Sequence, residues 1–375
     1  MSIIQTAPGP APAPPPGHVD VPQQARGAWA LSVQGIRTVL MLELRQRVRS
    51  SRWQLMLGLF FLTIGVLSGM VMAVSGFDDE SGSFLYGAVA WLVLTLGLLV
   101  APALSSTSVN GDRSAGTLAP LQMTLLSPAE IAVGKLLAGW GTALVFLATA
   151  LPFLLLAMIP GGTSVARFLV TTSMMALVLL AICAMALGWS AVAARPVSSA
   201  VMTYLTGAFL CLGTLIMFGL SFPLVTNQEQ VTVLEDPPDA YQGDFDYSTP
   251  IPVSECVQST AVRSVAHTEL TWWLLAANPY VVVADAAPGG SDEDVFGWIK
   301  YGVRSAQRGS PEPINECYAS RGDEFSMFGE DEPPAGLVWP FGLAINLGLG
   351  ALGVFVAVRR LSTPVKRLPR GTRIA

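Results

Sequence analysis

Six long apolar runs, separated by shorter polar segments, dominate the pattern of hydrophobic and polar positions along this chain. A spanning helix needs about 20 mostly apolar residues, and each run is long enough to cross a bilayer. The runs cover residues 53–74, 84–104, 131–159, 168–193, 201–225 and 337–358. The pattern therefore predicts an all-α polytopic membrane protein with six transmembrane helices.

The composition agrees with this interpretation. Of the 375 residues, 52% are hydrophobic and only 13% are charged, and the mean hydropathy is +0.54. These values are too apolar for a soluble globular protein.

The positions of lysine and arginine predict the orientation. Six arginines precede the first run: Arg26, Arg37, Arg45, Arg47, Arg49 and Arg52. Six basic residues follow the last run: Arg359, Arg360, Lys366, Arg367, Arg370 and Arg373. Because positive residues favour the cytoplasmic side, we expect a plasma (cytoplasmic) membrane protein with both termini in the cytosol.

The fifth and sixth runs are separated by a large loop, residues 226–336, which we expect outside the cell. It holds 19 of the 26 acidic residues and 5 of the 21 basic residues. The formal net charge of −5 thus averages a basic inside with an acidic outside, and it gives no reason to expect nucleic-acid binding. The loop has few strand signals, and we expect mostly surface loops there.

The predicted organisation has four parts. Residues 1–27 form a Pro-rich, disordered cytosolic tail, for which a partner-docking polyproline segment is the alternative. Residues 28–225 hold an amphipathic helix and the first five spans, with a cytosolic loop at 105–130. Residues 226–336 form the outside loop, and residues 337–375 form the sixth span and a basic cytosolic tail.

One apolar island lies inside the outside loop, at residues 270–284, and is interrupted by Asn278-Pro279. It is short for a spanning helix. One interpretation is a re-entrant or interfacial segment, with Trp272 and Trp273 at the membrane interface. The alternative is the buried core of a small outside domain.

The four cysteines divide into two pairs. Cys183 and Cys211 fall inside spans, where packing is the simplest role. Cys256 and Cys317 share the outside loop, where a disulfide persists. A Cys256–Cys317 bridge is the prediction, and two unpaired thiols are the alternative.

Residues 28–50 predict an amphipathic helix before the first span. Its apolar stripe consists of Trp29, Val33, Ile36, Leu40, Leu44 and Val48. Glu43 and Arg47 have the spacing of an ion pair along one helix. We expect the helix to lie on the inner membrane surface; a cytosolic extension of the first span is the alternative.

The sequence lacks the motifs of several kinds of catalytic and binding site. Gly134-Lys135 is not part of a nucleotide-binding loop, and no GxSxG or HExxH motif occurs. The two histidines, His18 and His267, lie outside the spans, so neither a membrane metal site nor a cofactor is expected. We therefore expect no enzymatic activity in this chain.

The spans also lack an ionisable group at their centres. Lys135 and Arg167 lie near span ends, where we expect them to snorkel to the surface. Carriers coupled to protons or sodium usually need a charged residue at mid-membrane. If the protein moves a solute uphill, the energy must enter from outside the bilayer.

The loop at 105–130 carries the most informative motif. Asp112-Arg113 precedes Gly116-Thr117, where Gly116 permits a turn and Thr117 is placed to cap a short helix. The apolar face of that helix is formed by Leu118, Leu121, Leu125 and Leu126. Ser127-Pro128-Ala129-Glu130 then predicts the start of the third span with a capping box. A rigid short helix with apolar side chains suits the groove of a cytosolic partner.

This segment resembles the first cytosolic loop of the type-2 permease family of ATP-binding-cassette (ABC) transporters. The matching residues are Asp112, Arg113, Gly116, Thr117, Leu118, Leu121, Leu125, Leu126, Pro128, Glu130, Gly134 and Lys135. Ser114 departs from the pattern, since an acid is common there. The order of amphipathic helix, six spans and large last loop, with its Asn278-Pro279, is also similar to that family.

The resemblance implies a function and a set of partners. The cytosolic loop would be the coupling helix, the helix at 28–50 the connecting helix, and ATP would be bound by a separate ABC ATPase subunit. A second permease copy or a sister permease would complete the pathway. We expect an exporter of an amphiphilic or apolar compound. The alternatives are a non-transporting membrane scaffold or receptor, and a secondary carrier, which the uncharged spans disfavour.

Overall fold

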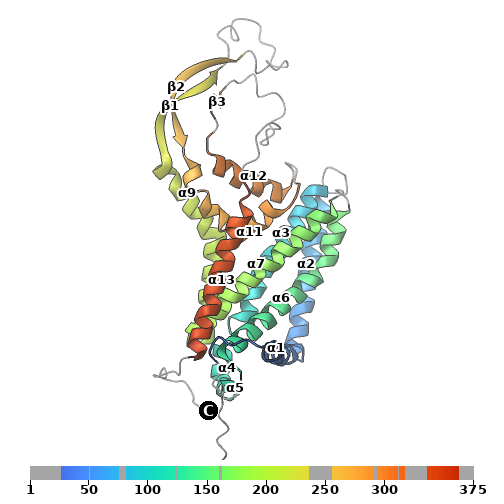
Figure 1. The fold of residues 1–375 in the computed structure, drawn as a ribbon. Helices are drawn as coiled ribbons and strands as arrows, with labels where there is room; N and C mark the ends of the chain where they lie inside the picture. The colour runs from blue at the N-terminus through green and yellow to red at the C-terminus, as the bar shows by residue number, and fades with distance from the viewer. Residues whose placement is uncertain are drawn as a thin grey trace, which may run out of the picture.

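The computed structural model describes residues 27–49, 51–75, 82–122, 126–159, 163–235, 256–289, 294–310, 312–316 and 336–362 (Figure 1). Four features predicted from the sequence lie wholly or largely outside these residues. They are the Pro-rich tail, Leu125, Cys317 and the basic C-terminal tail.

Six helices are long and apolar enough to cross a membrane, which confirms that prediction. The first four are α2 (Ser51–Ser75), α3 (Gly82–Ser105), α6 (Pro128–Met158) and α7 (Val165–Val192). The fifth combines α8 (Pro196–Ala208), a π-helical turn η1 (Phe209–Gly213) and α9 (Thr214–Val225), and the sixth is α13 (Trp339–Ser362).

Local capping explains where two of the spans begin. Ser127 accepts a hydrogen bond from the backbone of Glu130, whose side chain accepts from the backbone of Ser127, so the predicted capping box is present. Ser164 caps α7 in the same way, by accepting from the backbone N–H of Arg167 at 3.2 Å. These side chains satisfy backbone donors that would otherwise lie unpaired at the helix starts.

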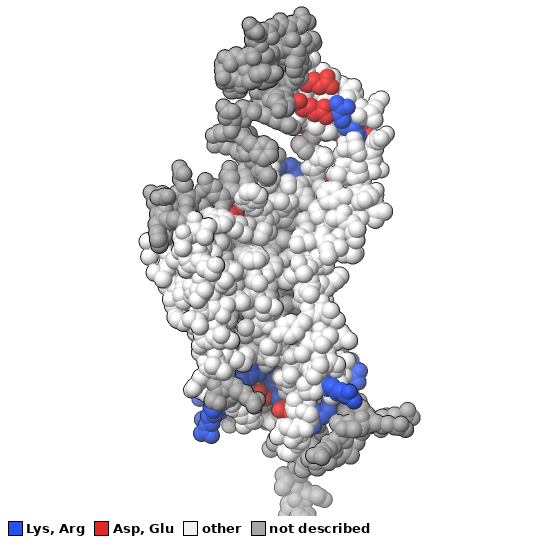
Figure 2. Space-filling model, turned by 180° about the vertical axis from the view of Figure 1, so that it is seen from behind, with Lys and Arg blue, Asp and Glu red and all other residues white. Residues whose placement is uncertain are grey.

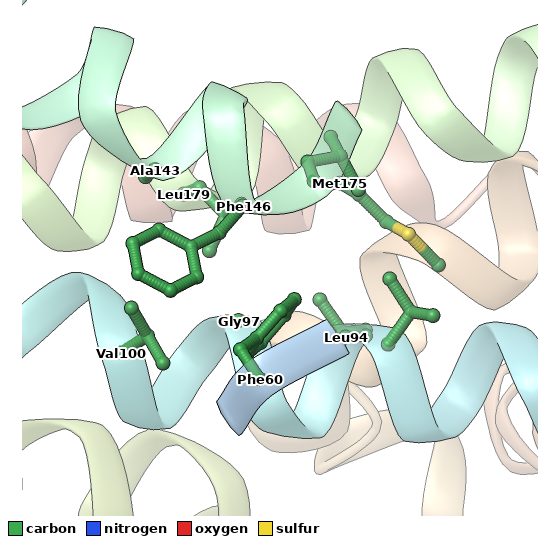
Figure 3. Close-up of a pocket in the computed structure, with 10 residues that line it drawn as sticks. Phe60, Leu94, Gly97, Val100, Ala143, Phe146, Met175 and Leu179 are labelled. Carbon is green, nitrogen blue, oxygen red and sulfur yellow. The ribbon is translucent and has the colours of Figure 1, made fainter. Parts of the chain in front are cut away.

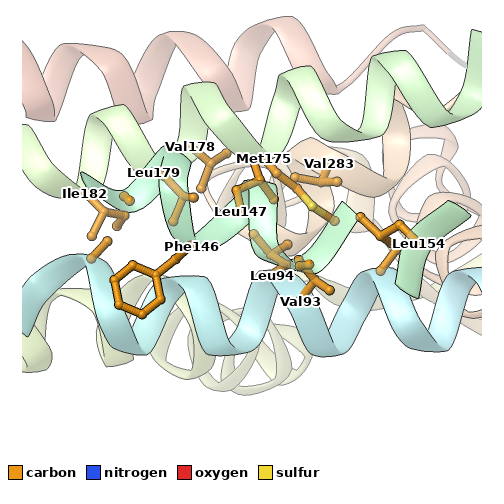
Figure 4. Packing of buried hydrophobic residues seen from close by; sticks show 14 of the residues in the cluster. Val93, Leu94, Phe146, Leu147, Leu154, Met175, Val178, Leu179, Ile182 and Val283 are labelled. Carbon is orange, nitrogen blue, oxygen red and sulfur yellow. The ribbon is translucent and has the colours of Figure 1, made fainter. Parts of the chain in front are cut away.

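The core of the helix bundle is apolar and tightly filled (Figure 4). Phe146 of α6 belongs to this core and meets the rings of Trp53 and Phe60 edge-on, with centroids 5.1 and 4.9 Å away. The helices α7 and α13 approach each other closely, since a Cβ on Gly188 would lie 2.6 Å from the Cα of Gly353. Small residues permit this approach of two backbones.

Three short helices lie at one end of the bundle: α1 (Val33–Val48), α4 (Asn110–Ala115) and α5 (Leu118–Gln122). We call this the basic end, because described arginines gather there while the middle of the molecule is uncharged (Figure 2). At the opposite end β1 (Thr226–Glu235) pairs antiparallel with β2 (Val257–Ala266), and we call it the hairpin end.

The β-hairpin corrects the prediction of an all-α fold and of few strands in the outside loop. β1 is also paired in parallel with the short β3 (Ile314–Asn315), which gives the strand order β2-β1-β3. Figure 1 shows β1 continuing directly from α9 and the hairpin projecting beyond the bundle. The protein is therefore mostly helical, with a three-stranded sheet at one end.

Four further helices lie between the sheet and the bundle: η3 (Thr268–Leu270), α10 (Trp273–Ala276), α11 (Pro279–Ala286) and α12 (Val295–Arg308). They include the apolar island at 270–284, which is helical and broken at Asn278-Pro279 as predicted. Val282 and Val283 of α11 are fully buried in the main core. The α11 part of the island therefore packs in the core of the helix bundle itself, rather than in the core of a separate outside domain.

Buried ion pairs hold this region on the bundle. Asp285 accepts from the backbone N–H groups of Val338 and Trp339 at 2.8 Å, and from Arg304 at 2.6 Å, so it caps α13 and joins it to α12. Arg167 pairs with the fully buried Asp294. The expectation that Arg167 snorkels is wrong, because Asp294 provides a partner inside the protein.

Candidate functional site

The predicted cytosolic loop forms two short helices rather than one. α4 ends at Gly116, whose φ of +73° is left-handed, as expected for a glycine at a turn. α5 starts two residues later. The hydroxyl of Thr117 donates to the carbonyl of Asp112 at 3.3 Å, so this side chain closes the turn between the helices instead of capping the second one.

The apolar side of the loop faces its own protein. Leu118 is only 7% exposed, and the half-buried Leu121 and Leu126 pack beside it. The cluster that receives them is formed by Val39, Val109, Ala129, Ile131, Ala132, Leu187, Ala191, Ala357, Val358 and Leu361. The expectation that these leucines project as knobs is therefore wrong for Leu118. Around the turn between α4 and α5, the exposed residues among those with described side chains are Ser114, Ala115, Thr117 and Pro120.

The loop is fastened to α6 through a buried ionic junction. The ammonium of Lys135 forms ion pairs with Glu43 of α1 and Asp112 of α4. The Lys135 side chain is 0% exposed, whereas Glu43 and Asp112 are 13% and 28% exposed. Lys135 thus does not snorkel; it joins α1, α4 and α6 at one point. We call these three residues the ionic junction.

A second polar contact fixes α1 on the bundle. The guanidinium of Arg47 donates to the carbonyl of Leu104 at 3.0 Å and to the hydroxyl of Thr142 at 3.3 Å. Burial lowers the pKa of Arg47, and the nearby Glu43 carboxylate opposes that change. The predicted pairing of Glu43 with Arg47 within α1 is therefore replaced by contacts to other helices.

Glycine makes the close approach of α1 to α6 possible. A Cβ on Gly35 would lie 2.6 Å from the carboxylate carbon of Glu130, and a Cβ on Gly134 would lie 2.6 Å from the Cβ of Val39. Ser32 donates to the same Glu130 carboxylate at 2.6 Å. The buried face of α1 is centred on Gly35 and Val39, and Trp29, Val33 and Val48 of the predicted stripe are exposed.

The start of the loop also forms hydrogen bonds with α7 and α8. The backbone N–H of Val109 donates to the hydroxyl of Ser190 in α7 at 2.9 Å. Ser199 of α8 donates to the carbonyl of Ser106. A displacement of α4 would therefore act on α6, α7 and α8 together.

A separate pocket of about 530 Å³ opens on the side of the bundle. Its wall is mostly apolar, and its hydrogen-bonding side chains include Trp91, Thr95, Tyr204, Asn278 and Tyr280. The other lining residues are Leu98, Leu99, Pro102, Ile182, Gly207, Ala208, Cys211, Leu212, Leu215, Val281 and Ile299. The pocket thus lies between α3, the fifth span and α11.

Asn278 links this pocket to the π-helical turn in the fifth span. A π turn leaves backbone groups without their regular helical partners. The side-chain amide of Asn278 donates to the carbonyl of Cys211 at 2.8 Å and to Thr214 at 3.1 Å, while its oxygen accepts from Tyr280 N–H at 2.9 Å. The predicted Asn-Pro position is thus a structural joint between α11 and the fifth span.

A void inside the bundle is much smaller (Figure 3). It measures about 10 Å³ and is lined by apolar side chains that include Phe60, Leu94, Phe146 and Met175. This volume holds at most one water molecule. This void therefore offers no passage for a solute.

The described cysteines differ in their bonding. Cys256 takes part in a disulfide, whereas Cys183 and Cys211 are free. The predicted partner, Cys317, lies outside the described residues, so the pairing stays a prediction. No cluster of three or more candidate metal ligands occurs among the residues that the structure describes.

No model of a known protein family matches the sequence, and no curated protein matches it.

Proposed function

We propose that this chain is the membrane-spanning permease subunit of an ABC transporter, powered by a separate ATPase subunit. The observation that carries the proposal is the ionic junction, in which a buried lysine joins the loop, α1 and a spanning helix. A loop that is held rigidly on the spanning helices can pass a movement of a bound ATPase to those helices. The sequence resemblance of this loop to a coupling helix supports the same function.

The proposed docking surface is the tip of the loop rather than its leucines. Leu118 and Leu121 pack against the protein and hold the two helices in place. The exposed residues Ser114, Ala115, Thr117 and Pro120 remain for a partner. A push on this tip passes through Lys135 to α6 and through Ser190 to α7.

The transported compound is proposed to be amphiphilic or apolar. The 530 Å³ pocket supports this proposal, because ligand sites of this size bind mostly through apolar walls with a few polar groups. Because the void inside the bundle is too small for a solute, the path is proposed to run along this pocket. A second permease copy or sister permease would close its open side. Export rather than import rests on the resemblance alone.

The basic end is proposed to face the cytosol and the hairpin end the outside of the plasma membrane. The positive-inside rule supports this orientation, and so does the disulfide at Cys256. The ATPase would then meet α4 and α5 from the cytosol.

Affinity purification from gently solubilised membranes tests the proposal. We expect an ATPase with a phosphate-binding loop to co-purify with the native protein, and to be lost from the variant Ala115→Arg/Pro120→Arg. Val197→Arg/Ser198→Arg is a matched control, since these exposed residues lie at the same end but outside the loop. Membrane insertion should be unchanged in both.

An alternative function is a membrane scaffold or receptor that uses the acidic, sheet-containing segment at the hairpin end. In that case no ATPase co-purifies with the native protein, and partners depend on the hairpin instead. That result would reject the permease proposal.

A further inference from the structure

A second groove lies on another side of the bundle, between α7, α8 and α13. It has a volume of about 200 Å³ and is lined by Met185, Gly188, Trp189, Val192, Thr206, Leu349, Leu352, Gly353 and Val356. Its polar groups are already paired, because Trp189 Nε1 donates to the hydroxyl of Thr206 at 3.0 Å. The groove therefore offers only apolar contacts to whatever fills it.

Two exposed arginines follow the groove-lining residues of α7 and α13 in the sequence. Residues three and four apart share a face of a helix, so Leu349, Leu352 and Val356 of α13 lead one turn further to Arg360. Arg360 is exposed, and so is Arg195, three residues after Val192 at the end of α7. Arg195 and Arg360 therefore lie beyond the last groove-lining residues of these two helices, Val192 and Val356.

α7, α8 and α13 contain no aspartate or glutamate. The ring of Phe355 lies 5.1 Å from the guanidinium carbon of Arg359, which adds a third positive group at the same end. The sequence beyond α13 contains Lys366, Arg367, Arg370 and Arg373 and no acidic residue.

From this arrangement we propose that the groove binds one anionic phospholipid. Part of an acyl chain fills the space between α7, α8 and α13, and the headgroup phosphate lies between Arg195 and Arg360. The occupant follows from position and charge: an apolar groove on membrane-spanning helices meets lipid chains, and the arginines at its end select a negative headgroup. This inference needs only a membrane-embedded chain and does not depend on transport.

Native mass spectrometry of the full-length protein in neutral detergent tests the site. The probes are phosphatidylglycerol and phosphatidylcholine with identical acyl chains. We expect one phosphatidylglycerol to be retained in preference to phosphatidylcholine, and the preference to fall by about fivefold for each arginine replaced in Arg195→Gln/Arg360→Gln. Val356→Trp, which fills the groove, should reduce retention of both lipids.

Arg45→Gln/Arg49→Gln is the matched control, since it removes the same charge from exposed positions on α1. It should keep the preference for phosphatidylglycerol. Equal retention of both lipids by the native protein would overturn the proposal. So would an equal loss in the control variant, because the attraction would then come from the basic surface as a whole. Normal lipid retention in Val356→Trp would show that the groove is not the site.

Discussion

Lys135 of α6 forms an ion pair with Asp112 of α4, so a residue of a spanning helix holds the short helix whose last residues form part of the proposed docking tip. The same ammonium pairs with Glu43 of α1. A buried charge is stable only when its partners are close and well placed. This contact therefore keeps α1, the loop and α6 in one arrangement, and it is the structural basis of the proposed coupling.

Removing the Lys135 charge should loosen this arrangement. We expect Lys135→Met to lower the free energy of unfolding by about 3 kcal/mol, since Glu43 and Asp112 would face each other without a cation. A thermal-melting series in detergent measures the effect. Arg45→Met, an exposed position on α1, serves as the control and should change little.

Stability and coupling can be separated at the same site. The triple variant Lys135→Met/Glu43→Gln/Asp112→Asn removes the unpaired carboxylates, so it should recover most of the melting temperature. We expect it nonetheless to lose transport-linked ATP hydrolysis in the reconstituted complex. Normal hydrolysis in this variant would mean that the ionic junction serves folding alone.

The contact between α1 and α6 depends on the absence of a side chain at Gly134. In Gly134→Ala, the new Cβ would lie 2.6 Å from that of Val39, which we expect to destabilise the protein by about 1–3 kcal/mol. Gly141 of the same helix has nothing within 4 Å of its Cβ position. Gly141→Ala should therefore be neutral or stabilising by up to about 1 kcal/mol. Similar melting temperatures for the two variants would contradict the close packing of α1.

Asn278 should control the shape of the fifth span at the side pocket. Asn278→Ala leaves the carbonyl of Cys211 and the hydroxyl of Thr214 without the amide, at an expected cost of about 1–3 kcal/mol. We expect faster alkylation of Cys211, which lines the pocket, by N-ethylmaleimide. Cys183 is fully buried and is the internal control. An unchanged Cys211 rate would argue against a joint at this position.

The base of the hairpin should respond to pH through His267. Its Nδ1 lies 2.7 Å from Glu269 Oε1 and its Nε2 lies 3.1 Å from Glu229 Oε1, so both ring nitrogens donate only in the protonated form. These hydrogen bonds, to Glu269 first and Glu229 second, raise the pKa of His267 above 6.5.

Because the pKa of His267 is higher in the folded state, protonation of this side chain stabilises the folded hairpin at pH values below its unfolded-state pKa. This stabilisation is lost as the pH rises through the folded-state pKa. Hydrogen exchange of β1 should therefore become faster, relative to its intrinsic rate, as the pH rises above about 6.5. His267→Gln should remove that extra dependence. A native protein with no such change across this range would contradict the pairing.

The spans were predictable because each run is long and uniformly apolar, and the capping box of Ser127 and Glu130 marked the start of α6 locally. The β-hairpin was not predictable in the same way. β1 and β2 are rich in polar residues and pair across more than twenty intervening positions, and only Val231 and Val233 of β1 are buried. Strand pairing of this kind depends on long-range contacts rather than on local pattern.

The residues of the candidate site could be identified from the sequence, but the orientations of their side chains could not. The motif located Asp112, Gly116 and Lys135, yet local spacing could not show that Leu118 turns inward or that Lys135 is buried. The sequence predicted an ion pair between Glu43 and Arg47, but Glu43 pairs with Lys135 instead. A helical spacing of four predicts a pair only when no other helix offers a partner. Both differences arise from the docking of α1 on α6, which is a tertiary contact.

Site-specific photo-crosslinking in intact cells tests the central claim most directly. A benzophenone amino acid at the exposed Ala115 should form an adduct with an ATPase that carries a phosphate-binding loop. The same probe at Gln228 of β1, at the hairpin end, should not. Absence of an ATPase adduct from position 115, or an equal adduct from position 228, would contradict the assignment of this loop as the coupling element of an ABC permease.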